Sequence, residues 1–371
     1  MPDPGPIYLD HNATTPIAPE VAEAMWPYVV THFGNPSSDH AVGRAARAGV
    51  EHAREQVAAL IGAHPDEIVF TSGGTEANNL AIRGSAALAG TRVALTTAVE
   101  HPATTAPLGL LADGGWAVHA LPVDAAGRAD PDAVPAGSVG LASVILAQNE
   151  VGTIQPVARI ADAVHRAGGV VHADAAQAVG KVPVDVEELG VDLLSIAGHK
   201  LYAPKGVGAL YVRRGTALAP MLVGAGQEGG IRPGTENVAS IVALGAACAL
   251  ATDLLPSEPE RQASLREELW TLLHTAIPAL VRISPAAGSL PNTLTIAIPG
   301  RIGADVLAAA PAVAASTGSA CHAGTHTPAA TLLAMGIPAE VALGAIRLSA
   351  GRSTTVADVR AAAAALVSAV G

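Results

Sequence analysis

The first 250 residues alternate short apolar runs with longer stretches whose apolar positions follow a helical period. The runs that predict strands are residues 67–72, 92–97, 139–150, 170–177 and 191–198. Residues 74–89 and 159–169 predict helices, and the second ends at Gly168 and Gly169, because glycine is a common helix stop.

Residues 139–150 carry an almost continuous apolar run, which suits a strand covered on both faces. Residues 206–215 predict a hairpin-like pair. Strands and helices that alternate at these lengths predict an α/β fold with a mostly parallel sheet. Ligands of such sheets bind beyond the carboxyl ends of the strands. We therefore expect the polar residues that follow these runs to gather around one cleft.

The pattern changes after residue 252. Residues 257–280 predict a charged amphipathic helix, residues 292–300 and 346–351 predict short strands, and an Ala-rich helix ends the chain. This change predicts two domains. The large one spans residues 15–252, and a smaller α+β domain is built from residues 1–14 and 253–371.

Composition narrows the class of protein. Half of the residues are apolar and only 14% are charged, which is typical of a globular protein. A net charge of -11 argues against a nucleic-acid partner, which requires a basic face. The N-terminus lacks a signal-peptide pattern, and the longest apolar run, residues 241–251, is too short to span a bilayer. With only two cysteines, we expect a cytoplasmic protein without a membrane partner.

Four sites after strands carry candidate chemistry, and each also has a plain structural interpretation. The turn at Gly74 and Thr75 opens a helix and could bind a phosphate, or be an ordinary capped turn. Lys200 could be a desolvated Schiff-base amine or a solvated lysine. Asp174 could pair with a protonated pyridine nitrogen or cap a helix. His101 could stack on a flat ring or lie at the surface.

Together these four sites match the parts of a pyridoxal phosphate site: a phosphate turn, a lysine, an acid for the ring nitrogen and a histidine for the ring face. Gln177 lies three positions after Asp174 and faces the same way if a helical turn begins there.

The chain resembles the cysteine desulfurases of the class-V aminotransferase type, in their long-loop branch, with selenocysteine lyase as a close relative. The similarity runs along nearly the whole chain. Its motifs are "YLDHNATTP", "FTSGGTEANNLAI", "QNEVGTIQP", "HADAAQAVGK", "GHKLYAPKGVGALYVRRG", "IRPGTENVA", "STGSACHAG" and "AIRLSAGRSTT". The resemblance implies pyridoxal phosphate as cofactor, the fold-type-I architecture of such enzymes, and a homodimer.

The resemblance also implies roles for the cofactor residues. Lys200 carries the cofactor and moves the Cα proton of the substrate. Asp174 pairs with the ring nitrogen, Gln177 contacts the ring hydroxyl, and His101 stacks on the ring and acts as acid or base. The residues that the resemblance assigns to the phosphate are Gly74, Thr75, His199 and, from the partner subunit, Thr235.

On the substrate side, the resemblance implies L-cysteine or L-selenocysteine as substrate. Arg347 binds its carboxylate, a task suited to a planar fork, and Asn149 lies near both cofactor and carboxylate. Cys321 is the implied nucleophile, and such a group must be a reachable thiolate. It receives the sulfur as a persulfide, leaves alanine as product and passes the sulfur to an acceptor protein.

Two positions depart from the family pattern. Ala197 stands where the family often has serine, which removes one side-chain contact to the phosphate, and Gln148 stands where asparagine is usual. Pro102 follows His101 where animal selenocysteine lyases usually carry aspartate, so this position favours the desulfurase, while "SACHAG" keeps the lyase open. A sulfur-delivery scaffold and a transaminase or epimerase of the same fold are further alternatives.

Both cysteines have a second interpretation. Cys321, His322 and His326 could be a metal cluster, but no fourth ligand is nearby, and we expect no metal site. Cys248 lies in an apolar, Ala-rich stretch and predicts a small buried core residue.

Overall fold

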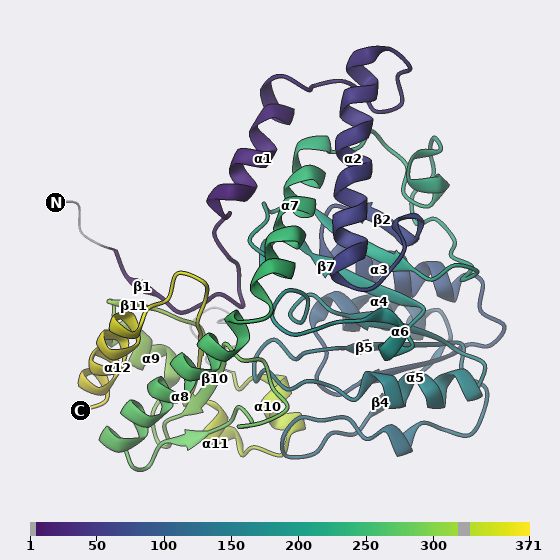
Figure 1. Cartoon of the computed structure of the whole chain (residues 1–371). Helices are drawn as coiled ribbons and strands as arrows, with labels where there is room; N and C mark the ends of the chain where they lie inside the picture. The colour runs from purple at the N-terminus through teal and green to yellow at the C-terminus, as the bar shows by residue number, and fades with distance from the viewer. Residues whose placement is uncertain (1–4, 318–326) are drawn as a thin grey trace.

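The computed structural model describes residues 5–317 and 327–371, and a seven-stranded sheet forms its centre (Figure 1). The strand order is β2-β8-β7-β6-β5-β3-β4. The strands are β2 (Ile68–Thr71), β3 (Val93–Thr97), β4 (Ala117–Leu121), β5 (Leu141–Ile145), β6 (Val170–Asp174), β7 (Leu193–Ala197) and β8 (Gly208–Val212). All neighbours are parallel except the two pairs that involve β8. The prediction of a mostly parallel α/β sheet is confirmed.

Strands β5 and β7 are buried at every position, because helices cover both faces of the sheet. The apolar run at residues 139–150 therefore forms the doubly covered strand that its sequence predicts. The prediction of a hairpin-like pair within residues 206–215 is wrong. That segment forms the single strand β8, and Gly206, at a φ of +86°, lies in the turn that returns it antiparallel to β7.

Helices of the first 254 residues pack around this sheet and, at one end, on one another. They are α1 (Pro19–Val30), α2 (Ala41–Leu60), α3 (Gly74–Ala86), α4 (Pro102–Asp113), α5 (Val157–Arg166), α6 (Val186–Leu189) and α7 (Val238–Leu254). Helix α7 packs against α1 and α2, and a Cβ atom at Gly245 of α7 would lie only 2.5 Å from the Ala53 Cα of α2. This close approach requires glycine. Cys248, also in α7, is fully buried, as its sequence context predicts.

The C-terminal part forms smaller sheets covered by helices, at the lower left of Figure 1. Its strands, with the N-terminal one, are β1 (Ile7–Tyr8), β9 (Val281–Arg282), β10 (Thr293–Ala297), β11 (Val313–Ala314) and β12 (Ala345–Ser349). Its helices are α8 (Glu258–Ala276), α9 (Gly303–Ala309), α10 (Ala330–Ala334), α11 (Ala339–Ala342) and α12 (Val356–Val370). Strand β1 pairs in parallel with β11, so the N-terminal segment joins this part of the molecule.

Two of the hydrophobic cores follow this arrangement. One lies around the large sheet and α1, α2 and α7, and another joins Leu9 to buried residues of α8, β10 and α12. The domain limits at residues 14/15 and 252/253 remain a prediction. Among the described residues, no single helix is long and apolar enough to cross a membrane; only α7 and α8 taken together meet the length and composition criteria, and they are bent by 76°.

Candidate active site

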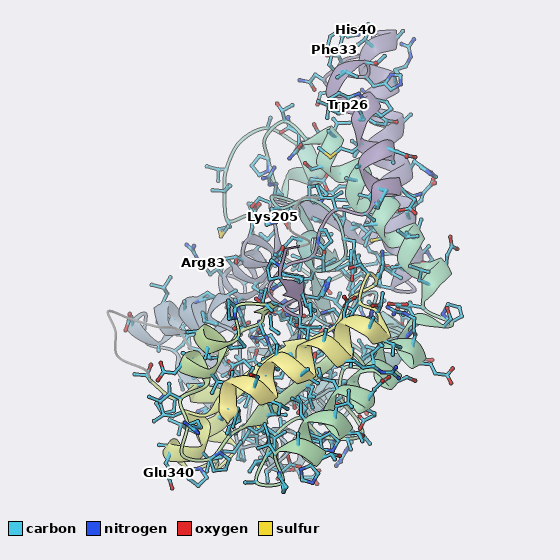
Figure 2. All side chains as sticks on the ribbon, turned by 90° about the vertical axis from the view of Figure 1, so that its left-hand side faces the viewer. Trp26, Phe33, His40, Arg83, Lys205 and Glu340 are labelled. Carbon is cyan, nitrogen blue, oxygen red and sulfur yellow. The ribbon has the colours of Figure 1, made fainter. Side chains whose placement is uncertain are left out.

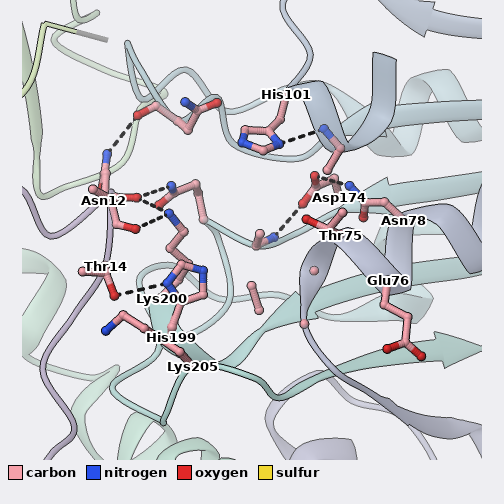
Figure 3. A pocket seen from close by; sticks show the side chains of 18 of the residues that line it. Asn12, Thr14, Thr75, Glu76, Asn78, His101, Asp174, His199, Lys200 and Lys205 are labelled. Carbon is pink, nitrogen blue, oxygen red and sulfur yellow. Dashed lines mark hydrogen bonds between the residues drawn. The ribbon is translucent and has the colours of Figure 1, made fainter. Parts of the chain in front are cut away.

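A cleft of about 790 Å³ opens at the carboxyl edge of the large sheet. Eight of the predicted site residues, together with Arg347 from the small sheet, line it. They are Gly74, Thr75, His101, Asn149, Asp174, Gln177, His199, Lys200 and Arg347. Figure 3 shows Asn12, His199 and Lys200 along one side of the cleft, with Thr75, Asn78 and Asp174 along the other. The predicted gathering of strand ends around one cleft is confirmed.

Asp174 is the last residue of β6 and its carboxylate is buried, with 4% of the residue exposed. Its Oδ2 accepts a hydrogen bond from Asn78 Nδ2 at 2.7 Å, and its Oδ1 accepts one from the main-chain N–H of Ala176 at 3.0 Å. These donors orient the carboxylate at the cleft wall. Asn78, on α3, was missed by the sequence analysis, because a polar residue inside a helix gives no local signal of its buried partner.

The turn between β2 and α3 presents main-chain N–H groups to the cleft. Gly73 has a φ of +151°, which favours glycine, and it precedes α3 without a capping side chain. The first N–H groups of α3, at Gly74 and Thr75, therefore have no partner within the helix, as an anion site requires. A Cβ atom at Gly74 would lie 3.2 Å from the Ala197 Cβ, so the smallest side chains meet on this side of the turn.

His199 lies in the 3-10 turn η3 (Gly198–Lys200), directly after β7. Its Nδ1 lies 3.2 Å from Thr14 Oγ1. Burial lowers the pKa of His199 to about 4, and the nearby amines of Lys200, Lys205 and Lys181 add to this effect. The imidazole is therefore neutral near pH 7 and offers one donor and one acceptor.

Lys200 projects from η3 into the cleft, and its amine donates to the main-chain oxygens of Asn12 and, at 2.8 Å, of Ala13. Burial and, to a lesser extent, the positive charge of Arg347 lower the pKa of Lys200 to about 8, against the opposing charges of Asp10 and Asp174. About a tenth of this amine is thus unprotonated at pH 7, far more than for an ordinary lysine, as a nucleophilic or basic lysine requires.

His101 is the N-cap of α4, and its Nδ1 accepts a hydrogen bond from the Ala103 N–H at 3.0 Å. Burial lowers its pKa, while Asp174 acts in the opposite direction. Because Nδ1 accepts this bond, the proton of the neutral ring lies on Nε2. The helix cap thus fixes which nitrogen of His101 can donate.

Arg347, on β12, brings the small sheet to the cleft. Its Nη2 lies 2.6 Å from Asp10 Oδ1, and its Nη1 donates to the Asn149 main-chain oxygen at 3.1 Å. Its Nε is buried and has no hydrogen-bond partner among the described residues. Asp10 was missed by the sequence analysis, although it stands in the "YLDHNATTP" motif, because its partner lies 337 positions away.

Gln177 and Lys200 both donate to the main-chain oxygen of Asn12. The Gln177 Nε2 donates to the Asn12 main-chain oxygen at 2.9 Å. The Asn12 side chain in turn donates to Thr293 Oγ1 at 2.8 Å, which ties the N-terminal segment to β10. Asn12 lines the cleft, as do Ala13 and Thr14 of the same motif, and the sequence analysis gave none of the three a role.

Cys321 lies outside the described residues, as do His322 and His326. The chain before this segment is attached at the cleft, because Ser316 and Arg347 exchange main-chain hydrogen bonds. After the segment, Thr331 of α10 donates to Glu150 Oε1 at 3.0 Å and accepts a hydrogen bond from Gln148 Nε2 at 3.2 Å. Gln148, one of the departures from the family pattern, thus holds α10 by a hydrogen bond to Thr331.

Thr235 is exposed and does not line the cleft of its own chain. The expectation that it serves a partner subunit remains a prediction. Within residues 5–317 and 327–371, no group of three or more His, Cys, Asp or Glu side chains could hold a metal ion.

The cleft residues fit pyridoxal phosphate. The free N–H groups of the β2–α3 turn suit its phosphate, and the buried Asp174 carboxylate suits a protonated ring nitrogen. The Lys200 amine, with a pKa of about 8, suits its aldehyde. These three groups line one cavity, which is large enough for a cofactor and a small substrate together.

Comparisons with known proteins agree with this fit. The family model "Aminotransferase class-V" matches residues 7–361. Cysteine desulfurase IscS of Dictyoglomus turgidum is 43% identical over 95% of this chain and 91% of its own length. Cysteine desulfurase NifS of Azotobacter vinelandii is 42% identical over 94% and 89%, respectively. A solved NifS-like protein has a TM-score of 0.92 and 34% identity, and the match covers 98% of each chain.

The family match includes every residue that lines the cleft. The chain therefore belongs to the class-V aminotransferase family and, within it, to the pyridoxal phosphate-dependent cysteine desulfurases.

Proposed function

We propose that this enzyme converts L-cysteine to L-alanine and takes the sulfur as a persulfide on Cys321, for transfer to an acceptor protein. The proposal rests on one observation: the Lys200 amine, with its lowered pKa, lines the same cleft as Asp174 and Arg347. Family membership supports it, and one solved relative, 34% identical, is described as SspA in complex with cysteine.

Pyridoxal phosphate, when bound, supplies an electron sink that makes the substrate Cα–H bond acidic and weakens its C–S bond. Residues on several sides of the cleft would hold this group. The N–H groups at Gly74 and Thr75 and the His199 ring would bind the phosphate, and Asp174 would pair with a protonated ring nitrogen. His101 would lie against the ring, with its Nε2 proton available to a reacting group.

The chain also positions the substrate and moves its protons. Arg347, which lines the cleft, would bind the substrate carboxylate beside Asn149. The Lys200 Nζ takes the Cα proton, because a pKa of about 8 leaves part of the amine unprotonated at neutral pH. The same amine can return a proton to the product.

The sulfur step balances without any external oxidant. The Cys321 thiolate attacks the substrate sulfur, a new S–S bond forms, and the substrate C–S bond breaks. The electron pair of that bond stays on carbon, which takes a proton and becomes the methyl group of alanine. Cysteine and the enzyme thiol thus give alanine and an enzyme persulfide, which an acceptor thiol then cleaves.

The first experiment measures alanine release from L-cysteine together with the mass of the protein. We expect one added sulfur atom on Cys321 and loss of both signals in C321A. The matched control is C248A, because Cys248 is buried in α7 and far from solvent. Equal alanine release by C321A and the unchanged enzyme would contradict the persulfide step, whereas formation of the sulfur-containing oxo acid in place of alanine would indicate a transaminase.

The same assay with L-selenocysteine tests the alternative. A selenocysteine lyase would release alanine from selenocysteine and none from cysteine. Negligible release from both amino acids, restored only by an added acceptor protein, would indicate the sulfur-delivery scaffold.

We propose that the enzyme is a homodimer. Large apolar side chains are exposed at the end formed by α1 and α2, among them Trp26 at 63% and Phe33 at 76% exposure. Figure 2 shows both residues at the far tip of the molecule. Exposed apolar groups that gather in this way suit an interface with a second copy.

We place the enzyme in the cytoplasm, because a reducing compartment suits a reactive thiol. Fractionation of cells would test this location.

A further inference from the structure

Lysine is rare in this chain, and every lysine lies in or beside the cleft. Of 21 lysines and arginines, only Lys181, Lys200 and Lys205 are lysines. Lys200 and Lys205 line the cleft, and Lys181 contacts two other residues that line it. Arginine, used at all other basic positions, has a larger planar head and keeps its proton. Lys181 therefore occupies a position to which a compact amine is suited.

The Lys181 amine is buried without a counter-charge. No carboxylate among residues 5–317 and 327–371 pairs with it, and its contacts are two amide oxygens. These are Gln177 Oε1 at 2.6 Å and Asn12 Oδ1 at 3.1 Å. Burial lowers its pKa well below that of an ordinary lysine, and Lys200 and Arg347 add to this effect. A buried amine without an ion pair costs stability, so its place is not explained by stability.

Lys181 determines which end of the Gln177 amide faces the cleft. Because the amine donates to Oε1, the Nε2 group is turned toward the Asn12 main-chain oxygen, which it contacts at 2.9 Å. The second hydrogen on Nε2 is left for a ligand. Gln177 can therefore meet a cofactor oxygen only as a donor.

Lys181 also orients Asn12. The Asn12 Oδ1 accepts from Lys181 and, at 3.0 Å, from Asn292 Nδ2, which leaves the Asn12 Nδ2 to donate to Thr293 and Asn149. With its side chain held in this way, the Asn12 main-chain oxygen receives Lys200 Nζ. One buried amine thus supports both the Gln177 amide and the carbonyl that binds the catalytic lysine.

We propose that Lys181 is a positioning residue of this site: by donating to Gln177 and Asn12, it holds the first as a donor toward the cofactor and the second as the acceptor for Lys200. This inference rests on the proposed function only for the identity of the cofactor. The contacts themselves belong to the chain.

The lowered pKa of Lys181 limits the positive charge that it brings to the site. The charged or titratable groups that respond to it or act on it are Lys200, Arg347, His11 and His199. The charge of Lys200 lowers the pKa of Lys181, whereas Lys181 is not among the groups that shift the pKa of Lys200. A substitution at Lys181 therefore acts on the site chiefly through the two hydrogen bonds that its amine donates.

The first test replaces Lys181 with methionine, which keeps the length and removes the donor. We expect K181M to bind pyridoxal phosphate about five- to tenfold more weakly, the range that follows from losing buried hydrogen bonds. The visible absorption band of the bound cofactor should also shift, because the Gln177 donor that faces the cofactor is no longer fixed. A folded K181M with unchanged affinity and an unchanged absorption band would overturn the proposal.

A double-mutant cycle separates positioning from a merely structural role. If Lys181 acts through Gln177, K181M should have little further effect on cofactor affinity in a Q177L background. Additive losses of affinity in the double variant would show that Lys181 does not act through Gln177, and the proposal would fail.

The unchanged protein provides a measurement that does not depend on a variant folding well. With lysine labelled at the side-chain nitrogen, the NMR spectrum contains signals from only three lysines, and K205M identifies the Lys205 signal. We expect the Lys181 amine hydrogens to exchange with solvent much more slowly than those of exposed Lys205. Equal exchange rates would contradict the buried double contact.

All of these measurements are made without substrate. If the unchanged enzyme forms no alanine from cysteine, the proposed function fails, while the affinity, absorption and exchange results still decide the role of Lys181.

Discussion

At the scale of single residues, opposite charges act on the Lys200 amine. Arg347 lowers its pKa, and Asp10, which pairs with Arg347 at 2.6 Å, raises it. Burial is the largest cause of the pKa of about 8. The ion pair on the cleft wall therefore tunes the amine, and breaking it from either side should shift the pKa of Lys200 in opposite directions.

We predict that the cofactor-free chain takes up pyridoxal phosphate at a rate that rises with pH to a midpoint near 8, because only the unprotonated amine reacts. R347M removes a positive charge and should raise this midpoint, while D10N removes a negative charge and should lower it. Stopped-flow absorption measures the rate at each pH. Shifts in the same direction for both variants would contradict the electrostatic account, and a K200A chain should develop no yellow colour.

At the scale of elements, the segment after η3 is joined to the loop that follows β12. Tyr202 has a φ of +65°, a left-handed conformation that is costly for a residue with a Cβ atom. Its hydroxyl accepts the Arg352 main-chain N–H at 2.7 Å, and the Arg352 guanidinium lies 4.1 Å from its ring centre. Two elements that carry cleft residues are thus locked together by one aromatic side chain.

We predict that Y202F lowers the free energy of unfolding by about 1–3 kcal/mol, because the Arg352 N–H loses its partner while the ring stays in place. Y202G would relieve the backbone but lose the ring, so it should destabilise the protein more than Y202F. Thermal unfolding measures both changes. The control is R360M, whose exposed ion pair with Glu268 should contribute less than about 1 kcal/mol. A Y202F protein as stable as R360M would contradict this account.

At the scale of the whole molecule, the proposed dimer makes a prediction that needs no interface structure. T235A should weaken cofactor binding, and K200A should abolish turnover. If Thr235 serves the partner's cleft, a mixed dimer of these two chains contains one complete site. Mixing the inactive K200A with the weakened T235A, after dissociation and reassociation, should therefore restore activity.

Recovery of up to about half of the activity per mixed dimer is expected, measured as alanine release at limiting cofactor. Sedimentation of the unchanged protein measures its oligomeric state. No recovery on mixing, with mixed dimers verified by mass, would mean that Thr235 acts within its own chain or not at all.

Local patterns in the sequence were enough to predict the large sheet and most of the cleft residues. Apolar runs of strand length, the glycine turn before α3, and polar residues at the strand ends are each readable within a few positions. Since parallel strands end at one edge, Asp174, His101 and Lys200 could be placed in one cleft. The roles of these residues came from resemblance to a family, which the comparisons then confirmed as membership.

Tertiary structure alone decided which polar groups support that cleft. Asp10 meets Arg347 across 337 positions, Asn12 meets Lys181 across 169, and Asn78 meets Asp174 across 96. No periodicity or spacing encodes such pairs, because each forms only when separate elements have packed and left a buried donor facing a buried acceptor. The reacting groups were therefore readable in the sequence, whereas the hydrogen bonds that fix their orientation and pKa required the folded chain.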